Sequence, residues 1–97
     1  MKQLKKVEVI ADSVEMTKII DTLEKLKISG YTLFKGVSGR GDRGMKNDDG
    51  LTGVFTNTYL IIVCSESESN AFIELVRPLL KRVGGICLVS DVQWVIH

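Results

Sequence analysis

One apolar run, Thr58-Tyr59-Leu60-Ile61-Ile62-Val63-Cys64, restricts the folds open to this chain more than any other feature. It is rich in β-branched residues and too short for a buried helix, which indicates a strand. Because its apolar side chains would point to both faces of a sheet, both faces need a cover. We therefore predict that this strand lies at the centre of a sheet.

The other apolar patterns predict three more strands and two helices. Alternation over Lys6–Ala11, and aromatic and β-branched residues over Tyr31–Val37, indicate two strands; Ile86–Val92 indicates a last one that continues through Trp94 and Ile96. Apolar residues recur at helical spacing in two segments. The first stripe is Met16, Ile19, Ile20, Leu23 and Leu26, and the second is Phe72, Leu75, Val76, Leu79, Leu80 and Val83.

Polar residues suggest where the two helices begin. Asp12 precedes the first helix, with Glu15 three residues later, and Ser65 precedes the second, with Glu68 at the same spacing. Each pair fits a capping box, in which the two residues bond to each other's backbone N–H groups.

Glycines and one proline suggest where the helices end. Ser29-Gly30 is expected to stop the first helix and Gly84-Gly85 the second. Pro78 lies inside the second stripe. Because proline removes a helical hydrogen bond, we predict a kink or a break near Arg77.

The resulting order is strand, helix, strand, loop, strand, helix, strand. This order predicts an α+β, ferredoxin-like βαββαβ fold, in which both helices lie on one face of an antiparallel sheet with strand order 4-1-3-2. No residues remain to cover the sheet's second face, although the last two strands are apolar at nearly every position. We therefore expect a second copy of the chain to cover it in a closed homo-oligomer.

Composition limits the class of protein. The 97 residues, 44% of them hydrophobic and with a formal net charge of +1, fit one globular domain without a general basic field, which argues against non-specific nucleic-acid binding. No apolar run is long enough for a signal sequence or a membrane span, so we expect a cytoplasmic protein. Cys64 and Cys87 lie in strand-like runs without metal or redox spacing, so we predict two buried thiols, no disulfide and no metal site.

The segment Gly36–Phe55 is the candidate functional loop, because it is charged, rich in glycine and without the apolar periodicity of a helix or strand. A loop of this length, about residues 38–57, is uncommon in a compact domain unless it has a function. Its first half carries Gly39, Arg40, Gly41 and Arg43. Read alone, the two arginines could be solvated loop charges.

The motifs Gly30-Tyr31-Thr32, Gly39-Arg40-Gly41-Asp42-Arg43 and Gly85-Ile86-Cys87-Leu88-Val89-Ser90 resemble those of the PII-like signalling proteins. The resemblance covers the whole chain, 1–97, as a single domain, and is closest to the branch associated with bicarbonate transport and carboxysomes. It implies a homotrimer with inward-facing sheets and an adenine nucleotide in each of three clefts between subunits. It also implies a mobile loop, the T-loop, through which the protein regulates a partner such as a transporter or an enzyme.

The resemblance also implies roles for single residues. Thr32 would face the adenine, and Gly39, Arg40, Gly41 and Arg43 would meet the phosphate at the loop base. Glycines let backbone N–H groups approach phosphate oxygens, and arginine adds charge-assisted hydrogen bonds.

A second phosphate-contacting turn would be formed by Gly84 and Gly85. This turn lacks the lysine-bearing segment of the nitrogen-regulating PII proteins, and their arginines after the last strand are missing from this sequence. AMP, ADP or cyclic AMP therefore fits at least as well as ATP, and bicarbonate is a plausible co-ligand.

No pairing of a nucleophile with a base points to catalysis, so we expect a regulator of signal transduction, linked to bicarbonate or to nitrogen and carbon status, and not an enzyme. The alternative is an amino-acid-binding regulatory domain of the same fold, which also binds ligands at subunit interfaces. Such a domain would not need the long loop with paired arginines.

Overall fold

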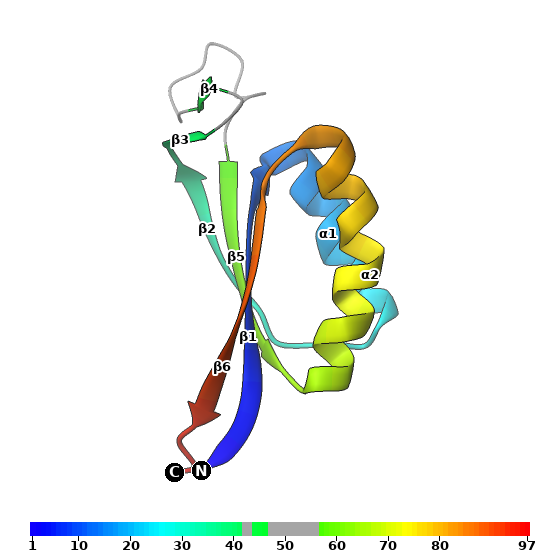
Figure 1. Cartoon of the computed structure of the whole chain (residues 1–97), viewed down its shortest axis with the longest axis vertical. Coiled ribbons are helices and arrows are strands. Elements are labelled where there is room, and N and C mark those ends of the chain that lie inside the picture. The colour runs from blue at the N-terminus through cyan, green and yellow to red at the C-terminus, as the bar shows by residue number, and fades with distance from the viewer. Residues whose placement is uncertain (42–43, 47–56) are drawn as a thin grey trace.

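Four long strands form one antiparallel sheet, and two helices pack on one of its faces (Figure 1). The computed structural model describes residues 1–41, 44–46 and 57–97. The elements are β1 (Lys2–Asp12), α1 (Ser13–Lys25), β2 (Thr32–Val37), β3 (Gly39–Gly41), β4 (Gly44–Lys46), β5 (Asn57–Cys64), α2 (Glu66–Val83) and β6 (Ile86–Trp94). The predicted α+β, ferredoxin-like fold is confirmed.

The sheet order is β2-β5-β1-β6, which is the predicted order 4-1-3-2 read from the other edge. β5 and β1 are the two inner strands, so the apolar run identified from the sequence lies at the centre as predicted. β6 ends at Trp94, so the expected continuation of this strand through Ile96 is wrong. The two chain termini lie side by side at the end of the sheet opposite β3 and β4 (Figure 1).

The core lies between the sheet and the helices. In β5, buried and partly exposed residues alternate: Leu60 and Ile62 point toward the helices, whereas Tyr59 and Ile61 point away. The core consists of Val7, Val9, Ala11, Met16, Ile19, Leu23, Ile28, Leu60, Ile62, Cys64, Phe72 and Val76. Leu75, which was predicted to face the core, is instead 49% exposed.

We call the sheet face opposite the helices the outer face. Register places Phe34, Tyr59, Ile10 and Ile86 in one row across it, and Thr32, Ile61, Glu8 and Leu88 in the next. Of the side chains on it, Phe34, Ile86, Leu88 and Trp94 are exposed. The chain itself therefore leaves this apolar face uncovered, which is the arrangement from which oligomerisation was predicted.

The helix starts follow from local capping. At α2, Ser65 accepts a hydrogen bond from the Glu68 N–H (3.1 Å) and the Glu68 carboxylate accepts one from the Ser65 N–H (2.9 Å), so the predicted capping box is confirmed. At α1, Asp12 is the N-cap and accepts from the Val14 N–H. The capping box predicted for Asp12 and Glu15 is not formed, because the Glu15 carboxylate instead forms ion pairs with Lys18 and Arg82.

The helix ends differ from the sequence prediction in two places. α1 ends at Lys25, before Ser29-Gly30, in a Schellman-type turn: the Ile28 N–H bonds to the Leu23 carbonyl, and Lys27 adopts the left-handed conformation with φ 59°. α2 runs without interruption through Pro78 to Val83, so of the predicted kink or break near Arg77 the break is wrong. The packing of α2 along the sheet stabilises the helix enough to offset the proline's missing hydrogen bond.

The loop predicted for residues 38–57 contains some regular structure. β3 and β4 pair in antiparallel fashion, with Arg40 opposite Met45. Residues 42–43 and 47–56 lie outside the described part, and so does the predicted phosphate ligand Arg43. In the described part of the chain, neither helix combines the length and apolarity needed to cross a membrane.

Candidate nucleotide-binding site

The turn Gly84-Gly85 connects α2 to β6 at the same end of the sheet as β3 (Figure 1). Gly84 has φ 84° and donates its N–H to the Leu80 carbonyl (2.8 Å), which closes the helix. Gly85 has φ 122°, and a Cβ added there would lie 2.8 Å from the Ile10 carbonyl oxygen. Both glycines are therefore required by the fold itself, and this requirement is independent of any phosphate.

Thr32 is the first residue of β2, an edge strand, and its side chain is exposed on the outer face. It pairs with Ile61 in the middle of the sheet. β2 then continues past Gly36, which has φ 73° and coincides with a shift in register. From Thr32 the chain runs seven residues to Gly39, a distance of roughly 20 Å along an extended strand.

The predicted site residues do not form a single cluster in one chain. Gly39, Arg40 and Gly41 form β3 and lie at the same end of the sheet as the Gly84-Gly85 turn. Thr32 lies on the opposite sheet edge from that turn, three strand spacings or about 14 Å away, and in a different row. Thr32 and the turn therefore do not lie side by side in one chain.

A polar cluster on the outer face was not identified from the sequence. The Tyr59 hydroxyl donates to the Glu8 carboxylate, and Lys6 Nζ lies 3.6 Å from Glu8. The hydrogen bond to Glu8 raises the pKa of Tyr59, and desolvation adds to the shift. Phe34 packs edge-on against the Tyr59 ring with centroids 5.8 Å apart. The signal was Glu8 itself, a carboxylate within the apolar run from Val7 to Ala11.

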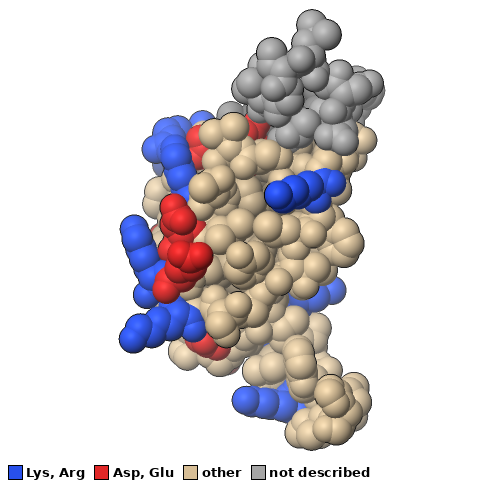
Figure 2. Space-filling model, turned by 180° about the vertical axis from the view of Figure 1, so that it is seen from behind, with Lys and Arg blue, Asp and Glu red and all other residues tan. Residues whose placement is uncertain are grey.

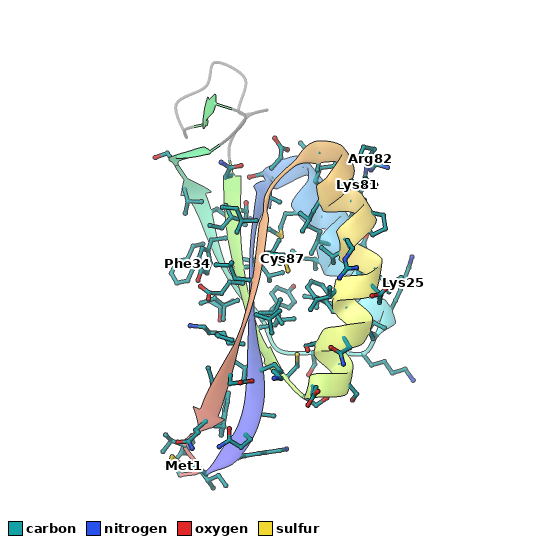
Figure 3. The ribbon with its side chains drawn as sticks, in the orientation of Figure 1. Met1, Lys25, Phe34, Lys81, Arg82 and Cys87 are labelled. Carbon is teal, nitrogen blue, oxygen red and sulfur yellow. The ribbon has the colours of Figure 1, made fainter. Side chains whose placement is uncertain are left out.

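Charge is distributed unevenly over the surface. Figure 2 shows acidic and basic side chains gathered on the side of the helices, whereas the side of the sheet is mostly uncharged. Figure 3 shows Phe34 pointing away from the helices and Cys87 lying between the sheet and the helices. The outer face is therefore better suited to contact with another protein surface than to exposure to water.

The two cysteines lie on strands separated by β1, since register pairs Cys64 with Lys5 and Cys87 with Val9. Both are free thiols; Cys64 is buried as predicted, whereas Cys87 is only partly buried, and desolvation raises the pKa of each. Among the described residues, no group of three His, Cys, Asp or Glu side chains is arranged to hold a metal ion.

Comparison with known proteins identifies the family. The family described as "Nitrogen regulatory protein P-II" matches residues 4–96. In the comparison with curated proteins, none matches the chain.

Solved structures with the same fold include several PII-like proteins. One is CPII, a nitrogen regulatory PII-like protein from Thiomonas intermedia K12, bound to ADP, AMP and bicarbonate. It is 25% identical over 95% of this chain and 88% of its own, with a TM-score of 0.88. The same protein bound to ADP and bicarbonate is 26% identical over the same shares, with a TM-score of 0.83. GlnK of B. subtilis in complex with ATP, 20% identical over 95% of this chain and 84% of its own, shares the fold with a TM-score of 0.65.

The family pattern spans nearly all of the sequence, and the two helices and four-stranded antiparallel sheet agree with it. The chain belongs to the P-II family of nitrogen regulatory proteins.

Proposed function

We propose that the protein is a homotrimeric, non-enzymatic PII-like regulator that binds an adenine nucleotide between subunits and thereby controls a partner protein, a transporter or an enzyme. The observation that carries the proposal is the separation of Thr32 from the Gly84-Gly85 turn on opposite sheet edges. A nucleotide that uses both has to take them from two chains.

The site that fits this geometry combines Thr32 of one subunit with the loop base and turn of its neighbour. Thr32 offers a hydroxyl on an exposed strand edge, where an adenine could bind. The loop base and the turn lie at one end of the sheet, where Gly39, Gly41, Gly84 and Gly85 carry no side chain that would keep a phosphate away from the backbone. The Gly84 N–H itself donates to the Leu80 carbonyl, so Gly84 would shape the turn. Arg40 and Arg43 would supply the positive charge.

The trimer is supported by the uncovered outer face. Its exposed apolar side chains would lose contact with water if three sheets faced inward, and closed symmetry would bury all three alike. The Lys6–Glu8–Tyr59 cluster would then lie inside the interface, where each polar group already has a partner.

The ligand class is supported by the CPII structures, which hold ADP, AMP and bicarbonate. We propose an adenine nucleotide, among AMP, ADP, ATP and cyclic AMP, with bicarbonate as a candidate co-ligand. The family match favours this function over the amino-acid-binding alternative. Two free thiols fit a reducing compartment such as the cytoplasm.

Calorimetric titration with these four nucleotides, with and without bicarbonate, tests the proposal. A charge-assisted hydrogen bond contributes roughly 1.5 to 3 kcal/mol, so Arg40→Ala or Arg43→Ala should weaken nucleotide binding about ten- to a hundredfold. Arg77→Ala, which removes an exposed arginine from α2, is the matched control and should bind like the parent. Unchanged affinity in both loop variants would refute the assigned phosphate site, and absence of binding by all four nucleotides would refute the ligand class.

A further inference from the structure

A hollow of about 430 Å³ lies on the helix-bearing side of the sheet, between the first turns of α1 and strands β2 and β5. Its volume is within the usual range for small-molecule sites. Met16, Ile20 and Leu33 form its apolar part, and Thr17, Thr58 and Lys35 supply polar atoms. None of these residues is among those predicted to bind the nucleotide.

The local backbone explains why the hollow exists. β2 is an edge strand, and its alternation points Leu33 and Lys35 toward the helix side, opposite Leu60 and Thr58. The strand bulges after Lys35, where Gly36 has φ 73° and no side chain to fill the space. The corner between β2 and α1 therefore stays open.

The polar groups of the hollow differ in their hydrogen bonding. The Thr58 hydroxyl is buried and lies 2.8 Å from the Ser13 hydroxyl, so these two groups bond to each other. Within the described part of the chain, the Lys35 ammonium has neither an ion pair nor a hydrogen bond, and the Thr17 hydroxyl has no hydrogen bond. In the part of the chain that the structure describes, the hollow thus combines an exposed ammonium group and an exposed hydroxyl, neither bonded to another side chain, with an apolar floor.

Among the described residues, no carboxylate forms an ion pair with Lys35. Asp12 accepts the Val14 N–H as the N-cap of α1, and Glu15 pairs with Lys18 and Arg82. Since neither of these carboxylates pairs with Lys35, its ammonium group can bond to the carboxylate of a ligand.

We propose that this hollow binds a small monocarboxylate with a short apolar tail. The carboxylate would bond to Lys35 and Thr17, and the tail would contact Met16, Ile20 and Leu33. The hollow faces the helix side, whereas the proposed trimer buries the outer face, so this binding does not depend on the proposed nucleotide site. A ligand here would lie beside Gly36, at the point where β2 leads into the loop.

Butyrate is a suitable probe, and butyramide is its neutral counterpart of similar shape. Titration of the ¹⁵N-labelled full chain without nucleotide, followed by two-dimensional NMR, reports on the Thr17, Leu33 and Gly36 amides. We expect saturable shifts at these amides with butyrate in the millimolar range, and binding of butyramide at least about tenfold weaker.

Two variants locate the site. Lys35→Met keeps an unbranched side chain one atom shorter and removes the charge, and should weaken butyrate binding about ten- to a hundredfold. Lys25→Met is the matched control, because Lys25 is also an exposed lysine of the α1 region but lies about 18 Å along the helix from Ser13. It should bind butyrate within about twofold of the parent. Thr17 is an exposed residue of α1 that lines the hollow, so the substitution Thr17→Phe should fill the hollow and abolish butyrate binding.

Three results would contradict the proposed carboxylate site. Non-saturable shifts up to about 50 mM butyrate, equal binding of butyrate and butyramide, or unchanged affinity in Lys35→Met would each overturn the proposal. A native NMR spectrum of each variant establishes that lost binding does not reflect lost folding.

Discussion

Leu88 provides the sharpest test of the proposed assembly. It lies on the outer face of the edge strand β6, is 56% exposed in the single chain, and pairs in register with Glu8. We consider the substitution Leu88→Lys. In the monomer, the new ammonium group would stand opposite Glu8, and such a cross-strand pair of opposite charge contributes roughly 0.2 to 1 kcal/mol. The substitution should therefore leave the monomer folded.

The expected cost to the trimer follows from the exposed fraction. Full burial of a leucine side chain contributes about 1.5 to 3 kcal/mol, so burying the remaining 56% in an interface contributes about 0.8 to 1.7 kcal/mol per chain. Three copies contribute about 2.5 to 5 kcal/mol, or roughly a hundred- to several-thousandfold in the trimer association constant. Desolvation of three ammonium groups would add several kcal/mol per ion.

Sedimentation velocity at micromolar concentration measures the outcome. The parent should sediment as a species of three times the 10.8 kDa chain mass, and Leu88→Lys as the single chain. Leu75→Lys is the matched control, since Leu75 is 49% exposed but lies on α2, away from the outer face, and it should remain trimeric. A monomeric parent, or a Leu88→Lys variant that stays trimeric, would refute the burial argument.

Three further predictions concern the fold. Hydrogen bonds, first that from the Ser65 backbone, lower the pKa of Glu68 below 4.5. The stabilisation of the folded protein by the Glu68 carboxylate is therefore complete above about pH 4.5 and is lost as pH falls through the lowered pKa. Denaturant titrations should show that Glu68→Gln destabilises the protein at pH 6 and less at pH 3, and an equal loss at both would contradict this. Lys27→Gly should raise the free energy of unfolding by about 0.5 to 1 kcal/mol, because glycine adopts φ 59° without strain; a loss of stability in the same assay would disprove the reasoning. Cys64 and Cys87 lie on strands two positions apart in the sheet, about 9 to 10 Å from each other, which is too far for a disulfide. Mass spectrometry after mild oxidation should therefore find no intramolecular crosslink between them, and finding one would overturn the strand order.

The sequence was sufficient for the architecture because periodicity and capping are local signals. The apolar run of β5, both helices and the Ser65–Glu68 capping box each depend on a few neighbouring residues, and each was confirmed, although Leu75 of the second stripe is exposed. The errors arose where tertiary contacts override a local rule. Pro78 is tolerated within α2, and α1 ends at a left-handed lysine because Ile28 is buried against the core.

The candidate site was less accessible to sequence reasoning. The resemblance implied that Thr32 and the Gly84-Gly85 turn belong to clefts between subunits, and the strand order places them on opposite edges of one sheet. The hollow beside Lys35 depends on the bulge at Gly36 and on its placement against α1, which no local pattern encodes.

The central claim is that the nucleotide site is completed between subunits, and titration of ADP into Leu88→Lys tests it most directly. This variant keeps Thr32, Arg40, Arg43 and both glycines of the turn, so it lacks only the neighbouring chain. Calorimetry should show ADP binding to the parent and to the trimeric Leu75→Lys control, and binding to the monomeric variant at least about a hundredfold weaker. If monomeric Leu88→Lys binds ADP as tightly as the parent, the site is contained within one chain and the account is wrong.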